Sequence, residues 1–219
     1  MNIIIFGANG EIGQGVLREC LLDADVKFVK AIGPISIDVR DQKLIQFRHL
    51  DMWNYKRIES ELKPFDVCIY CLGVSSLGMT EEKYTHITYT MTTRVANALV
   101  RLNPDMTFIY ISDAGADTSE KGSTMWARIK GRTENALLSM PFKAAFIFRP
   151  AGIQSFKGMG SEIPLFDLIS KPILVLLRKI FPRHIISTEI LSSAVLHVAK
   201  YGAPNQILEN SDITPLQLA

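Results

Sequence analysis

The chain has 219 residues, of which 47% are apolar and 21% are charged, and its formal net charge at pH 7 is +2. This composition predicts a single globular domain over residues 1–219 with a substantial core. The sequence has no long Lys/Arg stripe with interleaved aromatic residues, which argues against nucleic-acid binding. Because the first predicted strand begins at residue 2, no room remains for a signal peptide, and we expect a cytoplasmic protein.

Strands and helices alternate along most of the chain. An apolar strand at 2–6 leads into a helix with an apolar stripe, and further strands are predicted at 27–32, 43–47 and 66–71. They are followed by a helix at about 81–102, a strand at 106–112, a helix at about 124–139 and a strand at 144–149. This order predicts an α/β fold, a Rossmann-type doubly wound parallel sheet.

Three evenly spaced glycines, Gly7, Gly10 and Gly13, separate the first strand from the first helix. In a dinucleotide-binding turn, one glycine permits the tight turn, one lets the backbone approach a pyrophosphate, and one allows close packing of the helix on the sheet. The diphosphate would rest on the free N–H groups at the start of the helix. The strand and helix on either side favour this interpretation over a glycine-rich turn that binds nothing.

The pair Cys68 and Cys71 has the spacing of a redox or metal motif. It lies in a predicted strand, where side chains three residues apart point to opposite faces of the sheet. The two sulfur atoms therefore cannot share a metal ion, and we predict no metal site. We interpret both residues as small apolar side chains.

The chain changes in character after Pro150. A loop with Gly152, Gly158 and Gly160 leads into an apolar stretch at 164–181, which we interpret as part of a substrate-side cap over about 151–219 on a core of about 1–150. Charged residues and a proline interrupt this stretch, so it is too short to span a membrane. The alternative is interfacial binding through its apolar face, which basic residues flank.

Several segments together resemble one family. They are Gly7–Gly13, Asp66–Gly73, Ile111–Asp117, Trp126–Glu134, Phe148–Pro150 and Ile207–Asn210. The chain resembles the atypical short-chain dehydrogenase/reductases over nearly its whole length, and within them the NAD(P)H-binding oxidoreductases similar to the HIV Tat-interacting protein. The resemblance implies an NAD(P)-binding oxidoreductase with a small-molecule substrate. Related proteins also suggest that the helices at 81–102 and 124–139 form a two-fold interface in an oligomer.

The resemblance also implies which residues bind the cofactor, and all of them fall at carboxyl ends of predicted strands, where an open α/β sheet leaves its ligand crevice. The implied residues are Gly7, Asn9, Gly10, Glu11 and Ile12 for the pyrophosphate, Asp51 and Met52 for the adenine, Cys71, Leu72 and Gly73 for the adenosine ribose, and Pro150 and Ala151 for the nicotinamide. Asp51 has an alternative role, as a cap for the helix that follows it.

The choice between NAD and NADP depends on the end of the second strand, Ala31-Ile32-Gly33-Pro34. This end carries neither an acid for the ribose 2′-OH nor an Arg for a 2′-phosphate, and we expect Gly33 to line the cofactor site. Arg40 and Lys43 are candidates to reach a 2′-phosphate. The resemblance implies NADPH, and we favour NADP over NAD.

The catalytic positions depart from the superfamily, in which a Tyr-x-x-x-Lys pair on a helix is preceded by a Ser about thirteen residues earlier. Here the pair reads Trp126 and Lys130. Lys130, on the same helix face, can still bind the nicotinamide ribose hydroxyls. An indole N–H donates a hydrogen bond but has no accessible pKa, so Trp126 cannot transfer a proton. Ser112 and Asp113 stand near the serine position, where either can position the substrate.

Other proton donors must therefore be considered. Asp113 qualifies if burial raises its pKa, and Tyr84 or His86 could reach in from the long helix. Two functions remain open. One is an NAD(P)H-dependent oxidoreductase acting on a small carbonyl, alcohol or sugar-derived substrate, and the other is a non-catalytic NAD(P)H-binding redox sensor or regulatory protein in which Trp126 covers the nicotinamide.

Overall fold

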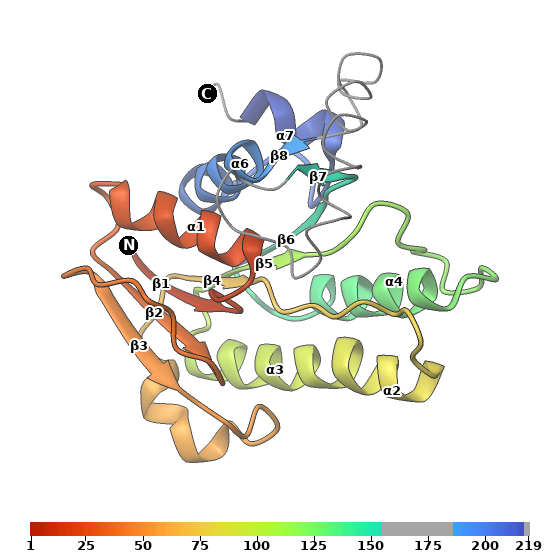
Figure 1. The fold of residues 1–219 in the computed structure, drawn as a ribbon, viewed down its shortest axis with the longest axis horizontal. Coiled ribbons are helices and arrows are strands. Elements are labelled where there is room, and N and C mark those ends of the chain that lie inside the picture. Colours follow the sequence, from red (N-terminus) through yellow and green to blue (C-terminus); the bar gives the residue numbers. More distant parts are fainter. Residues whose placement is uncertain (155–185, 217–219) are drawn as a thin grey trace, which may run out of the picture.

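The computed structural model describes residues 1–154 and 186–216, and within them the chain builds one parallel sheet between two layers of helices (Figure 1). Seven described strands follow the order β3 (Leu44–Arg48), β2 (Phe28–Gly33), β1 (Asn2–Phe6), β4 (Val67–Tyr70), β5 (Thr107–Ile111), β6 (Ala144–Arg149) and β9 (Ile207–Glu209). Every neighbouring pair is parallel. The prediction of a Rossmann-type doubly wound sheet is confirmed.

The central strands are apolar on both sides because helices cover both faces of the sheet. In β1, Ile3 and Ile5 join one core cluster, whereas Ile4 and Phe6 join the other, and all four are fully buried. The sequence order reverses between β1 and β4, which are hydrogen-bonded neighbours. In open α/β sheets such a reversal leaves a crevice at the carboxyl ends of the strands.

Different helices cover the two faces. α1 (Glu11–Leu22) and α6 (Thr188–Tyr201) pack together on one face, next to the short α7 (Asn210–Leu216). The 3-10 helix Lys56–Leu62, α3 (Thr92–Leu102) and α4 (Met125–Leu138) lie on the other face. The two helical layers are visible above and below the sheet in Figure 1.

The helix predicted at 81–102 is helical throughout but is not one regular α-helix. It consists of α2 (Glu81–Thr85), a π-helical segment His86–Met91, and α3. The Thr93 hydroxyl donates to the backbone carbonyls of Tyr89 and Thr90 at the end of the π-helical segment. Such side-chain bonds offer carbonyls an alternative to the regular ladder.

The C-terminal residues differ from the expected cap. β9 extends the sheet next to β6, and α6 packs against α1 in the core. Residues 186–216 therefore belong to the same layers as residues 1–150, because their apolar side chains fill the cluster on the α1 face. A short second sheet pairs β7 (Ile153–Gln154) with β8 (Ile186–Ser187). The predicted cap segment 164–181 lies outside the described residues.

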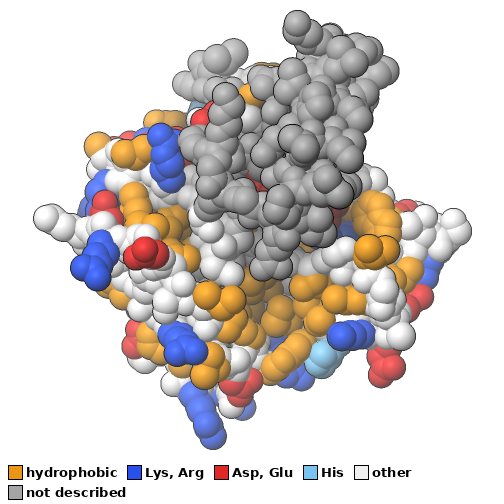
Figure 2. All heavy atoms as spheres, viewed as in Figure 1, with side chains coloured by type: hydrophobic (Ala, Val, Ile, Leu, Met, Phe, Trp, Pro, Cys, Tyr) orange, Lys and Arg blue, Asp and Glu red, His pale blue; other side chains and the backbone are white. Residues whose placement is uncertain are grey.

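Among the described helices, none is long and apolar enough to cross a membrane. Figure 2 shows Lys and Arg side chains scattered among Asp and Glu on the face that it presents.

Candidate functional site

The turn after β1 lies against the end of β4. Gly7 has φ +83°, a conformation that L-residues rarely adopt, and a Cβ there would lie 2.8 Å from the backbone N of Leu72. A Cβ on Gly13 would lie 2.1 Å from the carbonyl oxygen of Gly7. These two positions therefore require glycine, one for the tight turn and one for packing α1 onto it, as the sequence predicts.

Gly10 has a different role. Among residues 1–154 and 186–216, a Cβ there would meet only the Gly7 carbonyl oxygen, at 3.5 Å, so these residues leave the space above Gly10 open. Gly10 is also the N-cap of α1, and no side chain in the described part of the chain caps this helix. The first-turn N–H groups are therefore free to bind an anion, and the helix dipole favours negative charge there. This cradle fits a pyrophosphate, and a side chain at Gly10 would fill it.

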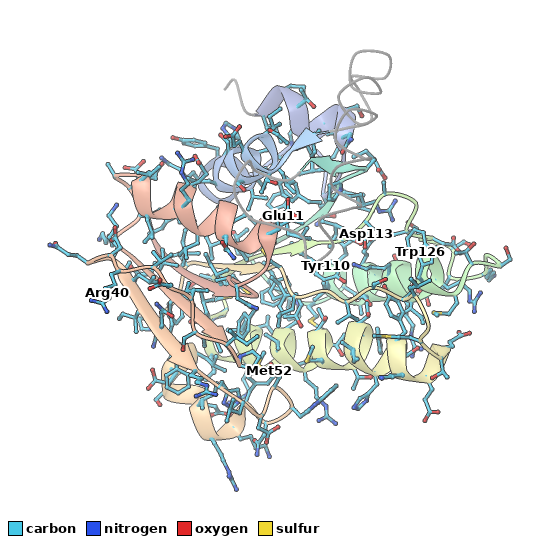
Figure 3. The ribbon with its side chains drawn as sticks, in the orientation of Figure 1. Glu11, Arg40, Met52, Tyr110, Asp113 and Trp126 are labelled. Carbon is cyan, nitrogen blue, oxygen red and sulfur yellow. The ribbon has the colours of Figure 1, made fainter. Side chains whose placement is uncertain are left out.

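A cavity of about 770 Å³ opens in front of this cradle, at the carboxyl ends of β1, β4, β5 and β6. Its lining includes many predicted site residues, namely Gly10, Glu11, Ile12, Cys71, Gly73, Ser112, Asp113, Trp126, Lys130, Pro150 and Ala151. Figure 3 shows Glu11 at the start of α1 and Asp113 and Trp126 beside α4. The chain thus brings pyrophosphate and catalytic candidates to one cavity. Its volume lies within the usual range of ligand pockets.

Lys130 forms an ion pair in the cavity wall. Its ammonium nitrogen lies 2.8 Å from Asp113 Oδ2 and 5.5 Å from the centre of the Tyr110 ring. Burial raises the pKa of Tyr110 well above its usual value, so its ring stays neutral beneath the cation. The next residue, Gly131, touches the loop after β5, since a Cβ would overlap the Asp117 carbonyl oxygen at 1.8 Å. This close approach holds Lys130 beside Asp113.

Behind the cavity lies a buried charge network that the sequence analysis missed. Glu134 on α4 is fully buried and accepts hydrogen bonds from the Ser112 hydroxyl and from Arg149 Nε, at 3.2 and 3.1 Å for its two oxygens. Arg149 also donates to Thr118 Oγ1 at 2.8 Å and to Glu209 Oε1 at 3.1 Å. Glu134 stands four residues after Lys130 on the same helix, and this spacing is the signal that could have found it.

The pKa of Arg149 reflects this network. Burial alone would lower it, but the hydrogen bonds and charges of Glu134 and Glu209 outweigh burial and raise the pKa above its usual value. The guanidinium is therefore charged at every accessible pH, and its Nε donates to both carboxylate oxygens of Glu134.

Two aromatic residues lie at the cavity, whereas the histidine considered as a proton donor does not. Trp126 and the buried Tyr84 both line the cavity. His86 does not line it, because its ring stacks on Trp53 with 4.0 Å between centroids. The hypothesis that His86 donates a proton is therefore wrong. Asp113 does not meet the condition of burial set for it as a proton donor, since its side chain is 55% exposed and is paired with Lys130.

The candidates for the adenosine side do not share one pocket, because Cys71 and Gly73 line the main cavity whereas Gly33 lies in a separate hollow with the pyrophosphate candidate Asn9. Asn9 and Gly33 line a small hollow of about 10 Å³ between the ends of β2 and β3. Asp51 accepts a hydrogen bond from the backbone N–H of Trp53 at 3.2 Å. This contact within a local turn resembles the capping role that was the alternative for Asp51. Met52 is buried in the core cluster of the α3 face, and Leu72 packs against the same cluster.

The cations expected to reach a 2′-phosphate lie elsewhere. The Lys43 amine donates to the carbonyls of Leu21 and Asp23, at 3.0 and 2.7 Å, near the C-terminal end of α1. Figure 3 shows Arg40 at the edge where β3 begins, away from Glu11. Instead, Arg48 at the end of β3 lines the hollow together with Gly33. Sequence reasoning passed over Arg48 because its position depends on the pairing of β3 with β2.

The cysteines lie on opposite faces of the sheet, as their spacing predicts. Cys68 belongs to the core cluster of the α3 face, and Cys71 packs against the cluster of the α1 face. Burial raises the pKa of Cys71 to about 12. Within the described ranges, no group of three His, Cys, Asp or Glu side chains is arranged to hold a metal ion.

No protein-family model matches the sequence. Solved structures are similar over nearly the whole chain. WbmG from Bordetella bronchiseptica, in complex with NAD, aligns with a TM-score of 0.69 and 12% identity, over 95% of this chain and 72% of that one. UDP-glucose 4-epimerase from Thermotoga maritima, with UDP-glucose, aligns with a TM-score of 0.70 and 12% identity, over 99% of this chain and 81% of that one. The PhqB reductase domain from Penicillium fellutanum aligns with a TM-score of 0.70 and 12% identity, over 96% of this chain and 67% of that one.

The chain has the fold of these proteins. At 12% identity the likeness concerns the fold alone, and activity must be argued from the residues of the site.

Proposed function

We propose that the chain binds a nicotinamide dinucleotide and acts as an oxidoreductase on a small alcohol, carbonyl or sugar-derived substrate. The observation that carries this proposal is the placement of the uncapped α1 N-terminus and of Lys130 on the walls of one cavity of about 770 Å³. The solved structure of WbmG, which has this fold, contains NAD. When bound, such a cofactor supplies or accepts a hydride.

The chain's own residues have separable tasks in this proposal. Gly10 and the first-turn N–H groups of α1 bind the pyrophosphate. Lys130 donates to the nicotinamide ribose hydroxyls, because its ammonium group carries three N–H donors and its ion pair with Asp113 Oδ2 does not occupy all of them. Pro150 and Ala151 line the same cavity on the β6 side and would contact the nicotinamide.

The finer assignment favours NADPH and the oxidoreductases similar to the HIV Tat-interacting protein. The exposed Arg48 supports NADPH, since its Nε donates to the Pro34 carbonyl at 3.2 Å beside Gly33, at the strand end where a 2′-phosphate would lie. An arginine fork can bind such a phosphate through two parallel bonds. A cytoplasmic location and an oligomer formed through 81–102 and 124–139 belong to the same proposal.

Trp126 favours a second candidate function. It occupies the position of the proton-donating tyrosine and cannot transfer a proton. A redox sensor that binds NAD(P)H without turnover would need no such donor.

Nucleotide binding tests the proposal directly. We expect NADPH to bind in isothermal titration calorimetry, and Gly10→Val to abolish binding while melting like the native chain, because a side chain at Gly10 meets open space. Asn97→Ala on the distant α3 is the matched control. Lack of binding of both NADH and NADPH at millimolar concentration would contradict the proposal. Binding without turnover, meaning no oxidation of NADPH with a broad panel of carbonyls and no reduction of NADP⁺ with a matching panel of alcohols and amines, would favour the sensor.

A further inference from the structure

The hydroxyl of Ser112 has a fixed direction in the cavity wall. A serine hydroxyl has one proton and two acceptor lone pairs. In this chain the proton is donated to Glu134 Oε1. Glu134 is fully buried, and both of its carboxylate oxygens also accept from Arg149 Nε, at 3.2 and 3.1 Å, so Glu134 acts as the acceptor toward Ser112. Ser112 lines the cavity, so it offers the cavity its lone pairs only.

Asp113 adds a second acceptor beside it. One carboxylate oxygen, Oδ2, is paired with Lys130, and Oδ1 has no partner within residues 1–154 and 186–216. The side chain is 55% exposed at the cavity surface. A carboxylate has about four lone-pair directions, so Asp113 can accept a further hydrogen bond without releasing Lys130.

This polarity is opposite to what a carbonyl substrate needs. A carbonyl oxygen only accepts hydrogen bonds, and it would face the lone pairs of Ser112 and the carboxylate of Asp113. A hydroxyl or a protonated amine donates, and it could bond to both. Lys130 and the indole N–H of Trp126 are donors elsewhere in the same lining, so the acceptor character belongs to the part of the cavity wall formed by Ser112 and Asp113.

We propose that this cavity binds its substrate through a hydrogen-bond-donating group, a hydroxyl or a protonated amine, held by Ser112 Oγ and Asp113 Oδ1. Glu134 is the positioning residue that keeps Ser112 an acceptor. This inference rests on the proposed function, because the bound compound is a substrate only if the chain is an enzyme. It narrows the substrate class to compounds that are bound through a hydrogen-bond donor. The polarity itself belongs to the chain's own side chains and can be measured without the cofactor.

Three probes of one ring size test the polarity, namely cyclohexanol, cyclohexylamine and cyclohexanone. The full chain, labelled with ¹⁵N, is titrated at pH 7, and the indole N–H signal of Trp126 reports binding, because Trp126 lines the cavity. Trp126→Phe assigns this signal against that of Trp53. We expect cyclohexanol or cyclohexylamine to bind at least about fivefold more tightly than cyclohexanone, because a buried group left without its partner costs affinity. The Asp113→Asn variant should weaken the amine most, which separates the two donors.

Exchanging the acceptor behind Ser112 supplies the sharper test. In Glu134→Gln the new amide can donate to Ser112, which frees the serine proton to point into the cavity, so the preference should shift toward cyclohexanone. A merely structural role for Glu134 would weaken all three probes equally. If this variant does not fold, Ser112→Ala replaces it and should reduce the preference of the native chain for donors.

Two results would overturn the inference. One is equal or tighter binding of cyclohexanone by the native chain, and the other is no shift of the Trp126 signal with any probe up to 100 mM, a limit about a hundredfold above a millimolar Kd. The titrations are run with and without NADPH. If NADPH does not bind but the preference for donors persists, the proposed function fails and this inference stands. If NADPH binds but the preference for donors is absent, the proposed function stands and this inference fails.

Discussion

Removing one partner from the buried pair of Glu134 and Arg149 should cost more stability than removing both. In Arg149→Met, the Ser112 hydroxyl is the one hydrogen-bond partner that the fully buried Glu134 keeps among the described residues. An unpaired buried charge of this kind destabilises a protein by about 3–5 kcal/mol. In Glu134→Leu, Arg149 still donates to Thr118 and to the half-exposed Glu209, so we expect a loss near the lower end, about 3 kcal/mol.

The double variant Glu134→Leu/Arg149→Met removes both charges and replaces them with apolar side chains of similar size. Such replacements are often close to neutral, so the double variant should be no less stable than the worse single variant. The measurement is urea unfolding of all four proteins at pH 7, followed by fluorescence and analysed as a double-mutant cycle.

Additive losses in this cycle would refute the reasoning. They would mean that the two side chains contribute through packing alone and that the charges of Glu134 and Arg149 are not coupled. The inference that Ser112 is an acceptor would then lose its physical basis as well.

Three further predictions concern the nucleotide site and the surface. Arg48→Ala should raise the Kd of NADPH about tenfold or more and leave that of NADH within about twofold, since only NADPH has a 2′-phosphate; equal effects in calorimetry would contradict the NADP preference. Burial would raise the pKa of Asp23, but hydrogen bonds, foremost from Lys200, hold this pKa below its usual value. The ionised Asp23 therefore stabilises the fold above about pH 4, and this stabilisation is lost as the pH falls through the lowered pKa. Lys200→Met should therefore lower Tm more at pH 7 than at pH 3, whereas an equal deficit at both pH values would indicate lost packing. Because its pKa is about 12, Cys71 should stay unalkylated by iodoacetamide at pH 8 until the chain is unfolded in urea, and rapid labelling of the native chain in mass spectrometry would disprove this.

Local sequence signals predicted the elements of the sheet and the turn of the cradle. Strand β1 is a run of apolar residues, and Gly7 and Gly13 are positions where the structure has no room for a Cβ. These features depend on neighbours along the chain or on backbone sterics, so a sequence can carry them. The role of the residues after Pro150 was predicted less well, because β9 pairs with β6 over more than fifty intervening residues.

The chemical character of the site depends on contacts that spacing does not reveal. Sequence alone determined that Lys130 shares a helix face with Trp126 and that an indole stands where a proton donor is expected. Tertiary structure decided that His86 turns to Trp53, that Arg48 reaches the hollow beside Gly33, and that Glu134 lies behind Ser112. The physical reason is that periodicity states which face a side chain occupies, whereas its hydrogen-bond partner comes from another element that only the packed sheet and helices bring within reach.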